Sequence, residues 1–266
     1  MQSFAYHRPT SVAAAAGQLR ATGAVAIAGG MSLLPVMKHR LAAPAALVDL
    51  ADIEGLSEIA ADASSVTIGA MARHVAVADS AVVRASIPAL AALAAGIGDP
   101  AVRNRGTIGG AIANADPAAD YPAAVLGLNA TIVTDRREIA GAAFFTGMFT
   151  TALMPGELIA AVRCPIPLAA GYAKFRSPAS RYAVVGVFVA RFADSVRVAV
   201  TGAGPSVFRV PAMEAALSAR FEPAAVAGIA VAADGLNGDI HAEPAFRAHL
   251  VTVMAGRAVA SACAAA

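Results

Sequence analysis

Two glycine pairs, Gly29-Gly30 and Gly109-Gly110, constrain the fold of this chain more than any other feature, because each stands at the end of an apolar run. Glycine at such a turn permits positive φ and lets backbone amides approach a ligand closely. Amides gathered at a turn form a concave set of donors that suits a pyrophosphate. A single glycine pair is equally well explained as the close of a strand. The two pairs together predict a site that grips one diphosphate from two sides.

Other nucleotide-binding patterns are missing from the sequence. The nearest approach to GxGxxG is Gly202-Ala203-Gly204-Pro205, which the proline interrupts before any long helix could begin. A GxxxxGK[ST] motif does not occur either. A Rossmann-type dehydrogenase and a mononucleotide kinase therefore fit poorly.

The hydrophobic pattern of the first two thirds predicts alternating helices and strands. The first segment indicates a helix over 11–23, a strand that ends in the glycine turn over 24–30, a helix over 31–40 and a strand over 45–53. A second block begins at about Leu56 with two strands around the Asp62-Ala63-Ser64 turn, followed by helical stretches that include 86–98. A strand is expected to lead into the second glycine pair, and a hairpin over 130–141 follows.

The last third has a different character. Antiparallel strands are expected over 173–177, 183–191 and 195–204, and helices over 213–221, 223–236 and 244–260. An antiparallel sheet followed by helices predicts an α+β fold and argues against a doubly wound parallel sheet. Prolines at 165 and 167 mark the crossover. We expect one domain over 1–166, with subdomains of about 1–55 and 56–166, and a C-terminal domain over 170–266.

Composition limits the possible partners. The formal charge is only +2 with scattered Lys and Arg, so no phosphate-tracking stripe for nucleic acid is expected. No window approaches the roughly 18 uninterrupted large apolar residues of a transmembrane segment, and the N-terminus lacks a signal-peptide pattern. Cys164 and Cys263 form neither a CxxC pair nor a disulfide framework. These features indicate a cytoplasmic protein without a metal site of its own.

Two segments carry a resemblance to a known family. AGGMSLLP, starting at Ala28, and RNRGTIGGAIANADPAADYPA, starting at Arg103, resemble the two flavin signatures of the FAD-binding medium subunits of molybdenum hydroxylases. This family includes carbon monoxide dehydrogenase and xanthine dehydrogenase, and the resemblance covers essentially the whole chain. It implies a two-part FAD-binding domain of the type found in vanillyl-alcohol oxidase and xanthine dehydrogenase, followed by a C-terminal α+β domain.

The resemblance also implies a set of FAD-binding residues. Two loops would hold the pyrophosphate: Ala28, Gly29, Gly30, Met31, Ser32 and Leu33, and Thr107, Ile108, Gly109, Gly110 and Ala111. Asp120 would accept a hydrogen bond from a sugar or ribityl hydroxyl. Ile159 and Lys174 fall where the family places an apolar contact and a lysine near the flavin ring, although Lys174 is equally compatible with a solvent-facing strand position.

Several neighbouring residues have competing interpretations. Asp116 precedes Pro117 and is interpreted as a helix cap. Tyr182 could stack near the ring, but a strand tyrosine is more often in the core. Relatives often carry His or Gln where this chain has Met31, which leaves only backbone donation there. Arg103 and Arg105 could reach phosphate or be solvated, and His39 and His74 show no metal-ligand spacing.

The resemblance implies an oxidoreductase subunit that transfers electrons from iron–sulfur clusters through FAD to a quinone, NAD or dioxygen. No catalytic side chain is expected at the flavin. The implied partners are a large molybdopterin subunit and a small iron–sulfur subunit in a dimer of heterotrimers, because two cysteines cannot supply the four thiolates of a [2Fe–2S] cluster. The alternatives are a free-standing FAD oxidase and a flavin-free scaffold subunit.

Overall fold

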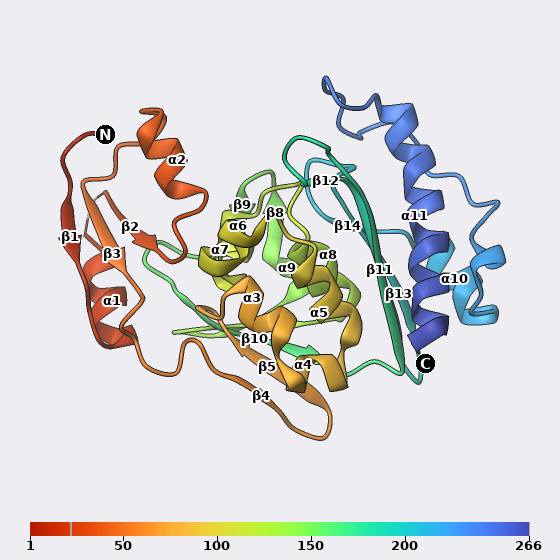
Figure 1. Cartoon of the computed structure of the whole chain (residues 1–266), viewed down its shortest axis with the longest axis horizontal. Coiled ribbons are helices and arrows are strands. Elements are labelled where there is room, and N and C mark those ends of the chain that lie inside the picture. Colours follow the sequence, from red (N-terminus) through yellow and green to blue (C-terminus); the bar gives the residue numbers. More distant parts are fainter. Residues whose placement is uncertain (22, 266) are drawn as a thin grey trace.

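The computed structural model describes residues 1–21 and 23–265 and contains three main sheets arranged along its longest axis (Figure 1). The N-terminal sheet has the order β1-β3-β2, with all strands parallel. Helices α1 and α2 follow β1 and β2, as the crossovers between parallel strands require. The elements are β1 (Ala5–His7), α1 (Val12–Leu19), β2 (Ala24–Ile27), α2 (Leu33–Lys38) and β3 (Ala46–Asp49).

The predicted pattern of this segment is confirmed with one addition, the short strand β1. The predicted helix 11–23 ends at Leu19, and its Thr22 lies outside the described residues. Ser11 caps α1 by accepting a hydrogen bond from the Ala14 amide. A small core, containing Ala15, Val48 and Leu50, lies between α1 and the sheet.

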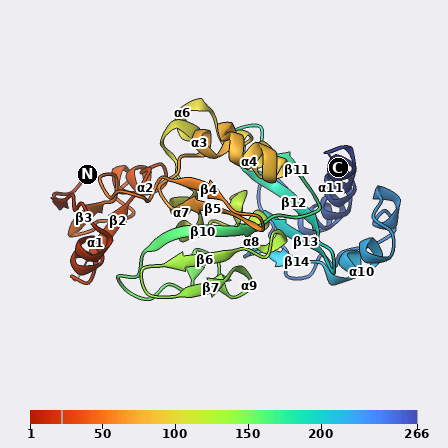
Figure 2. The same cartoon turned by 90° about the horizontal axis from the view of Figure 1, so that it is seen from below.

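The middle sheet is antiparallel, with the order β4-β5-β10-β6-β7 (Figure 2). The predicted hairpins at 62–64 and 130–141 are both present. Asp62 closes the first, accepting from Ser64 and Ser65, and these hydrogen bonds lower the pKa of its carboxyl to about 2. The strands are β4 (Ile59–Ala61), β5 (Ser65–Gly69), β6 (Thr131–Thr134), β7 (Glu138–Ala140) and β10 (Ile159–Pro165).

Short helices connect and cover this sheet, and alanine-rich sequence lets them pack closely. They are α3 (His74–Asp79), α4 (Ala81–Ser86), α5 (Pro88–Ala95), α6 (Pro100–Arg105), α7 (Ile108–Asn114), α8 (Tyr121–Gly127) and α9 (Gly141–Phe144), and β8 (Phe145–Gly147) pairs with β9 (Thr150–Thr151). The strand predicted before Gly109 is wrong: Ile108 begins α7, and Thr107 is its N-cap. A glycine pair in the first turn of a helix looks like a strand end because neither glycine carries a helix-favouring side chain.

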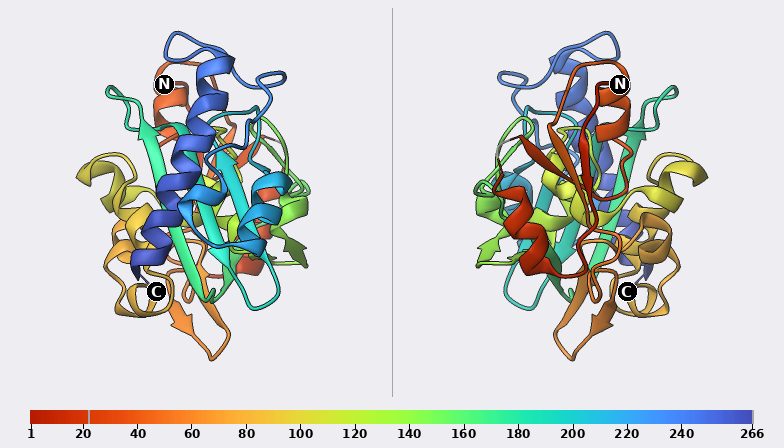
Figure 3. Two further views of the ribbon diagram at one scale, coloured as in Figure 1. Left: turned by 90° about the vertical axis from the view of Figure 1, so that its right-hand side faces the viewer. Right: turned by 90° about the vertical axis from the view of Figure 1, so that its left-hand side faces the viewer.

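The C-terminal sheet, β11-β12-β13-β14, is antiparallel as predicted. Strand β12, inside this sheet, is buried on both faces. Phe188 and Ala190 pack toward the middle sheet, whereas Val187 and Val189 face α11. Figure 3 shows α11 lying across the outer face of this sheet. The elements are β11 (Ala169–Arg176), β12 (Ala183–Arg191), β13 (Val196–Thr201), β14 (Phe208–Arg209), α10 (Pro211–Ala219), η1 (Pro223–Ala225) and α11 (Pro244–Ala265).

The predicted helix 223–236 is wrong, since only the single 3₁₀ turn η1 forms there. Gly228 and Gly235, the latter with φ +75°, disfavour a continuous helix. Helix α11 is long and apolar enough to cross a membrane by length and composition alone. In the fold it packs on β11 and β12 with one face buried, as a core helix does. The observed α+β architecture agrees with the predicted class.

Candidate functional site

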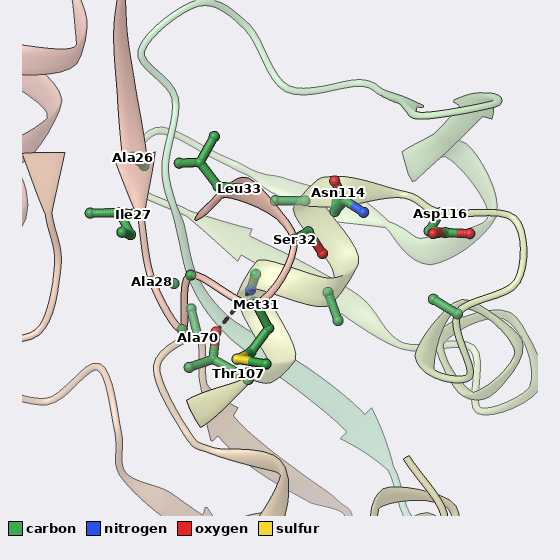
Figure 4. Close-up of a pocket in the computed structure, with 18 of the residues that line it drawn as sticks. Ala26, Ile27, Ala28, Met31, Ser32, Leu33, Ala70, Thr107, Asn114 and Asp116 are labelled. Carbon is green, nitrogen blue, oxygen red and sulfur yellow. Dashed lines mark hydrogen bonds between the residues drawn. The ribbon is translucent and has the colours of Figure 1, made fainter. Parts of the chain in front are cut away.

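A cavity of about 720 Å³ lies where the three units meet, and its wall is mostly apolar. This volume is within the range of small-molecule and cofactor sites. The wall brings together the loop after β2, the turn and helix around α7, and residues of the β11–β12 connection. Figure 4 shows the loop from Ala28 to Leu33 beside the helix that begins after Thr107, with Asn114 and Asp116 further along.

The first glycine loop is a set of free backbone donors. No described residue accepts a hydrogen bond from the amides of 28–33. Gly30 has φ +74°, which lets the chain turn from β2 into α2. Ser32 stands at the N-cap position of α2 but makes no side-chain cap, so its hydroxyl is also available. Six successive amides that donate to no described residue, in a loop that lines the cavity, fit the donor set that a pyrophosphate needs.

The second glycine loop has its amides already paired. Ile108 N–H donates to Ala72 O at 3.0 Å and Gly109 N–H to Ala70 O at 2.8 Å, while Gly110 N–H donates to Thr107 Oγ1 at 3.1 Å. This loop therefore contributes to the cavity mainly through Gly109 and Gly110, which leave the backbone uncovered by side chains. A Cβ on Gly110 would lie 2.9 Å from Thr107 Oγ1 and in ordinary contact, at 3.5 Å, with Ala28 Cβ, so a side chain here would fill the space between the two loops.

Gly29 fixes the contact between the loops. A Cβ at this position would lie 2.2 Å from Arg105 O and 2.7 Å from Gly106 Cα, and backbone atoms cannot move aside. Gly106 is in turn held on His74, whose Nε2 would be 2.4 Å from an added Cβ. His74 is buried against Tyr121, with ring centroids 5.4 Å apart. Burial lowers the pKa of His74 to about 4, so the imidazole is neutral at pH 7.

The structure places twelve of the fourteen predicted site residues in the cavity wall. Ile108 and Lys174 are the exceptions. Ile108 is 1% exposed and points into the core under α7. Lys174 lies behind the wall, where its Nζ is 2.8 Å from Asp120 Oδ1. The residues in the wall are 28–33, Thr107, Gly109, Gly110, Ala111, Asp120 and Ile159.

Asp120 is a deeply buried carboxylate of the wall, at 4% exposure. Its Oδ1 accepts a hydrogen bond from Tyr172 OH at 2.5 Å in addition to the ion pair with Lys174. Burial raises the pKa of Asp120, and the Lys174 charge opposes that rise. The salt bridge with Lys174 compensates for part of the desolvation of this buried carboxylate.

The interpretation of Asp116 as a helix cap is wrong. Its Oδ1 accepts from the Ala118 amide at 2.9 Å in a local turn, and the next helix begins only at Tyr121. Asp116 lines the cavity instead, where burial raises the pKa of its carboxyl. The Asp-Pro pair resembled a cap because both structures place an aspartate oxygen on a nearby amide.

Of two neighbouring residues with competing interpretations, Tyr182 lines the cavity and Arg103 does not. Tyr182 lines the cavity at 44% exposure, and burial together with the nearby Asp116 and Asp120 raises the pKa of its hydroxyl. Arg103 does not reach the cavity, because its guanidinium donates to the carbonyls of Ile97 and Gly98, both at 3.0 Å. Sequence reasoning did not single out the wall residues Ile97, Leu153 and Arg181, which lie outside the two signature segments, or Asn114, which lies inside the second one.

Comparisons with known proteins agree with this site. Residues 2–167 match the family described as the FAD binding domain in molybdopterin dehydrogenase, and the chain belongs to this family. The carbon monoxide dehydrogenase medium chain of Afipia carboxidovorans is 43% identical over 62% of this chain and 59% of its own length. The nicotine 6-hydroxylase medium subunit of Paenarthrobacter nicotinovorans is 37% identical over 66% of both chains.

A solved structure extends the similarity to the full length. The reconstituted CO dehydrogenase from Oligotropha carboxidovorans matches with a TM-score of 0.92 and 32% identity, covering 100% of this chain and 99% of the matched chain. The curated matches named above span 59% and 66% of those relatives' lengths. The chain is thus an FAD-binding medium subunit of the molybdenum hydroxylase family, and its relatives are subunits of oxidoreductases.

Proposed function

We propose that this chain is the electron-transfer subunit of a molybdenum-containing dehydrogenase, in which FAD receives electrons from iron–sulfur clusters and passes them to an acceptor. The observation that carries the proposal is the cavity itself. Its free amides over 28–33 and its buried carboxylate Asp120 suit the diphosphate and the hydroxyls of FAD. When bound, FAD supplies the two-electron redox chemistry, and the chain's own residues bind and orient it.

The proposed contacts follow from the geometry. The amides of 28–33 hold the pyrophosphate, and the bare backbone at Gly109 and Gly110 lets it lie close to α7. Asp120 accepts from a ribityl or sugar hydroxyl, and Ile159, at 5% exposure, forms an apolar part of the wall against the ring. We also propose the division into domains at 1–166 and 170–266, since β10 ends at Pro165 and β11 begins at Ala169 in another sheet.

The substrate chemistry belongs to partners in this proposal. Within the described residues no group of three or more His, Cys, Asp or Glu could hold a metal ion. The two cysteines of the sequence cannot provide the four thiolates of a [2Fe–2S] cluster. A large molybdopterin subunit and a small iron–sulfur subunit, assembled as a dimer of heterotrimers in the cytoplasm, complete the proposal. The acceptor is a quinone, NAD or dioxygen.

The proposal is tested by anaerobic reduction. The chain is purified alone and also co-expressed with candidate large and small subunits, and each preparation is mixed with carbon monoxide, an aldehyde or an N-heterocycle. We expect the FAD absorption of the complex to bleach with one of these substrates and that of the isolated chain to remain. Steady turnover by the isolated, cluster-free chain would instead establish a free-standing oxidase. A chain that takes up no FAD on reconstitution would establish the scaffold alternative.

A further inference from the structure

Two irregular parts of the cavity wall are held by contacts from elsewhere in the fold. The first is the turn over 116–120, where Thr201 Oγ1 donates to Pro117 O at 2.9 Å and the Gly202 amide donates to the same oxygen at 2.7 Å. The second is the segment 152–158 between β9 and β10, which forms neither helix nor strand. Four of its residues line the cavity: Leu153, Gly156, Glu157 and Leu158.

The segment 152–158 also contacts the N-terminal unit. Gly156 has φ +68°, and a Cβ there would lie 3.0 Å from Arg20 Cγ, just after α1. Leu158 belongs to the small core between α1 and the N-terminal sheet. Backbone outside a helix or sheet lacks ladder hydrogen bonds, so its position depends on other partners. A shift of this segment would change the shape of the cavity wall.

The carboxylate of Glu157 is one such partner. The side chain of Glu157 has 0% exposure, so the part of this residue that reaches the cavity is its main chain. Arg137 donates to both carboxylate oxygens, from Nε to Oε1 at 2.9 Å and from Nη2 to Oε2 at 3.0 Å. Thr134 Oγ1 donates to Oε1 at 2.8 Å. The Met154 amide donates to Oε2 at 2.7 Å, which ties the carboxylate back to its own segment.

The ion pair with Arg137 keeps this buried carboxylate charged. The hydrogen bond from the Arg137 side chain is the main reason that the pKa of Glu157 falls to about 2, so the carboxyl is ionised at neutral pH. Bidentate hydrogen bonds between a guanidinium and a carboxylate fix direction as well as distance. Arg137 Nη2 also donates to Ala152 O at 2.7 Å. Glu157 and Arg137 therefore determine where the segment lies relative to the turn between β6 and β7.

The rest of that turn holds the same segment. The Leu158 amide donates to Asp135 Oδ1 at 2.7 Å, and the Asp135 amide donates to Leu158 O at 2.9 Å. Arg136 Nη2 donates to Gly156 O at 3.0 Å. Each residue of 134–137 thus contacts the segment, and the β6–β7 hairpin at the edge of the middle sheet is its anchor (Figure 2).

We propose that Glu157 and Arg137 are positioning residues of the FAD site, and that their ion pair fixes the segment 152–158 as part of the cavity wall. The inference rests on the proposed function, in which this cavity holds FAD. The pair acts through the main chain of the segment. Without the pair, FAD would have to order this part of the wall as it binds, and the free energy of that ordering would weaken affinity.

The experiment measures FAD dissociation constants of the full chain by flavin fluorescence, together with the visible circular dichroism of the bound flavin, below the melting temperature of each variant. Glu157→Ala should weaken binding by about tenfold or more, the scale of a lost interaction with a charged group, and should alter the dichroism. Glu157→Gln retains an oxygen acceptor for Thr134 or Met154, so it should bind FAD within about fivefold of the native chain. This milder variant also provides the test if Glu157→Ala does not fold.

Glu214 provides a matched control for general destabilisation. Its carboxylate is also bound by one arginine, with Arg209 Nε 2.7 Å from Oε1 and Nη2 2.6 Å from Oε2, and it accepts from the Val198 amide at 3.0 Å. Glu214 lies on α10, outside the cavity wall. Glu214→Ala should therefore lower the melting temperature and leave FAD affinity and dichroism unchanged. Glu138→Gln, which weakens an exposed pair with Arg163, should change neither the melting temperature nor the affinity.

Native FAD affinity in both Glu157 variants would overturn the inference and leave the FAD assignment standing. Equal losses of affinity in Glu157→Ala and Glu214→Ala would also overturn it, because the effect would then follow overall stability. A native chain that takes up no FAD would refute the proposed function together with this inference.

Discussion

The two glycine turns look alike in sequence but work differently in the fold. The loop over 28–33 offers six amides that donate to none of the residues described by the structure, and Gly30, with φ +74°, precedes α2. The turn at 107–111 has paired amides and a helical backbone, and it contributes only an uncovered surface. The comparison teaches that a glycine pair has at least two uses at a ligand site, to free donors and to remove bulk. Sequence alone does not separate the two uses.

The largest effect should come from breaking the contact between the turns. Gly29→Ala places a Cβ 2.2 Å from Arg105 O, and the backbone of neither loop can yield without moving the other. We expect FAD binding to weaken by roughly a hundredfold or more, about 3 kcal/mol, together with a lower melting temperature. Fluorescence titration and thermal melts measure both. Gly228→Ala, where no atom lies within 4 Å of the added Cβ, is the control, and native FAD affinity in Gly29→Ala would refute the close contact.

The next effect isolates the left-handed backbone of the first turn. Gly30→Ala forces φ +74° on an L-residue and brings its Cβ to 2.9 Å from Leu34 Cδ1. The strain of about 1–2 kcal/mol should weaken FAD binding by about fivefold to thirtyfold. Gly235→Ala imposes a similar φ of +75° far from any neighbour, so it should lower stability and leave FAD affinity unchanged. Equal FAD affinity in the two variants would show that Gly30 has no special role.

His74, which packs against Gly106 next to the second turn, should make the stability of the fold depend on pH. The pKa of His74 is about 4 in the fold, below the unfolded value of 6.5, so protons bind preferentially to the unfolded chain as the pH falls through this window. Unfolding free energy should drop by roughly 2 kcal/mol between pH 7 and pH 5 on account of this group. Denaturant titrations at both values should show a smaller drop in His74→Leu. The exposed His39→Leu is the control; an identical drop in all three proteins would contradict the assignment.

The smallest effect should come from the second turn itself. Gly110→Ala adds a methyl group within a helix, where alanine is favoured, and its nearest contact is Thr107 Oγ1 at 2.9 Å. We expect the melting temperature to stay within a few degrees while FAD affinity falls by roughly threefold to tenfold, because the open surface is filled. Gly256→Ala, in α11 with open space around the added Cβ, should leave binding unchanged. A loss of stability without a loss of affinity would reverse the roles of the two turns.

Much of the fold was predictable from local pattern. The hairpin at 62–64, the antiparallel strands of the last third and the helix from Pro244 follow from alternation, turn residues and length. The failure at 223–236 arises because alanine and glycine dominate that segment. The failure before Gly109 arises because a glycine pair in the first turn of a helix resembles the end of a strand. Alanine packs in either kind of element, so in such sequence it does not separate a strand face from a helix face.

The candidate site was predictable as two loops and one carboxylate, and the contacts between them were not. Asp120 and Lys174 are 54 positions apart, and nothing local to either residue indicates that they meet. The role of Asp116 was missed because an aspartate before proline has the same local pattern in a turn as at a helix start. The two glycine turns differ in whether their amides are hydrogen-bonded. In the second turn the acceptors are carbonyls distant in sequence, those of Ala70 and Ala72.

The matched family domain does not include all the residues that hold the cavity wall in place. The family match ends at residue 167, two positions before β11 begins, yet the turn before Asp120 is anchored by Thr201 and Gly202. A gene fragment cut at that limit would encode the family domain without the anchors that hold one wall of its own cavity. We therefore expect an exchange of this domain between relatives to succeed only when the following residues up to the C-terminal sheet are exchanged with it.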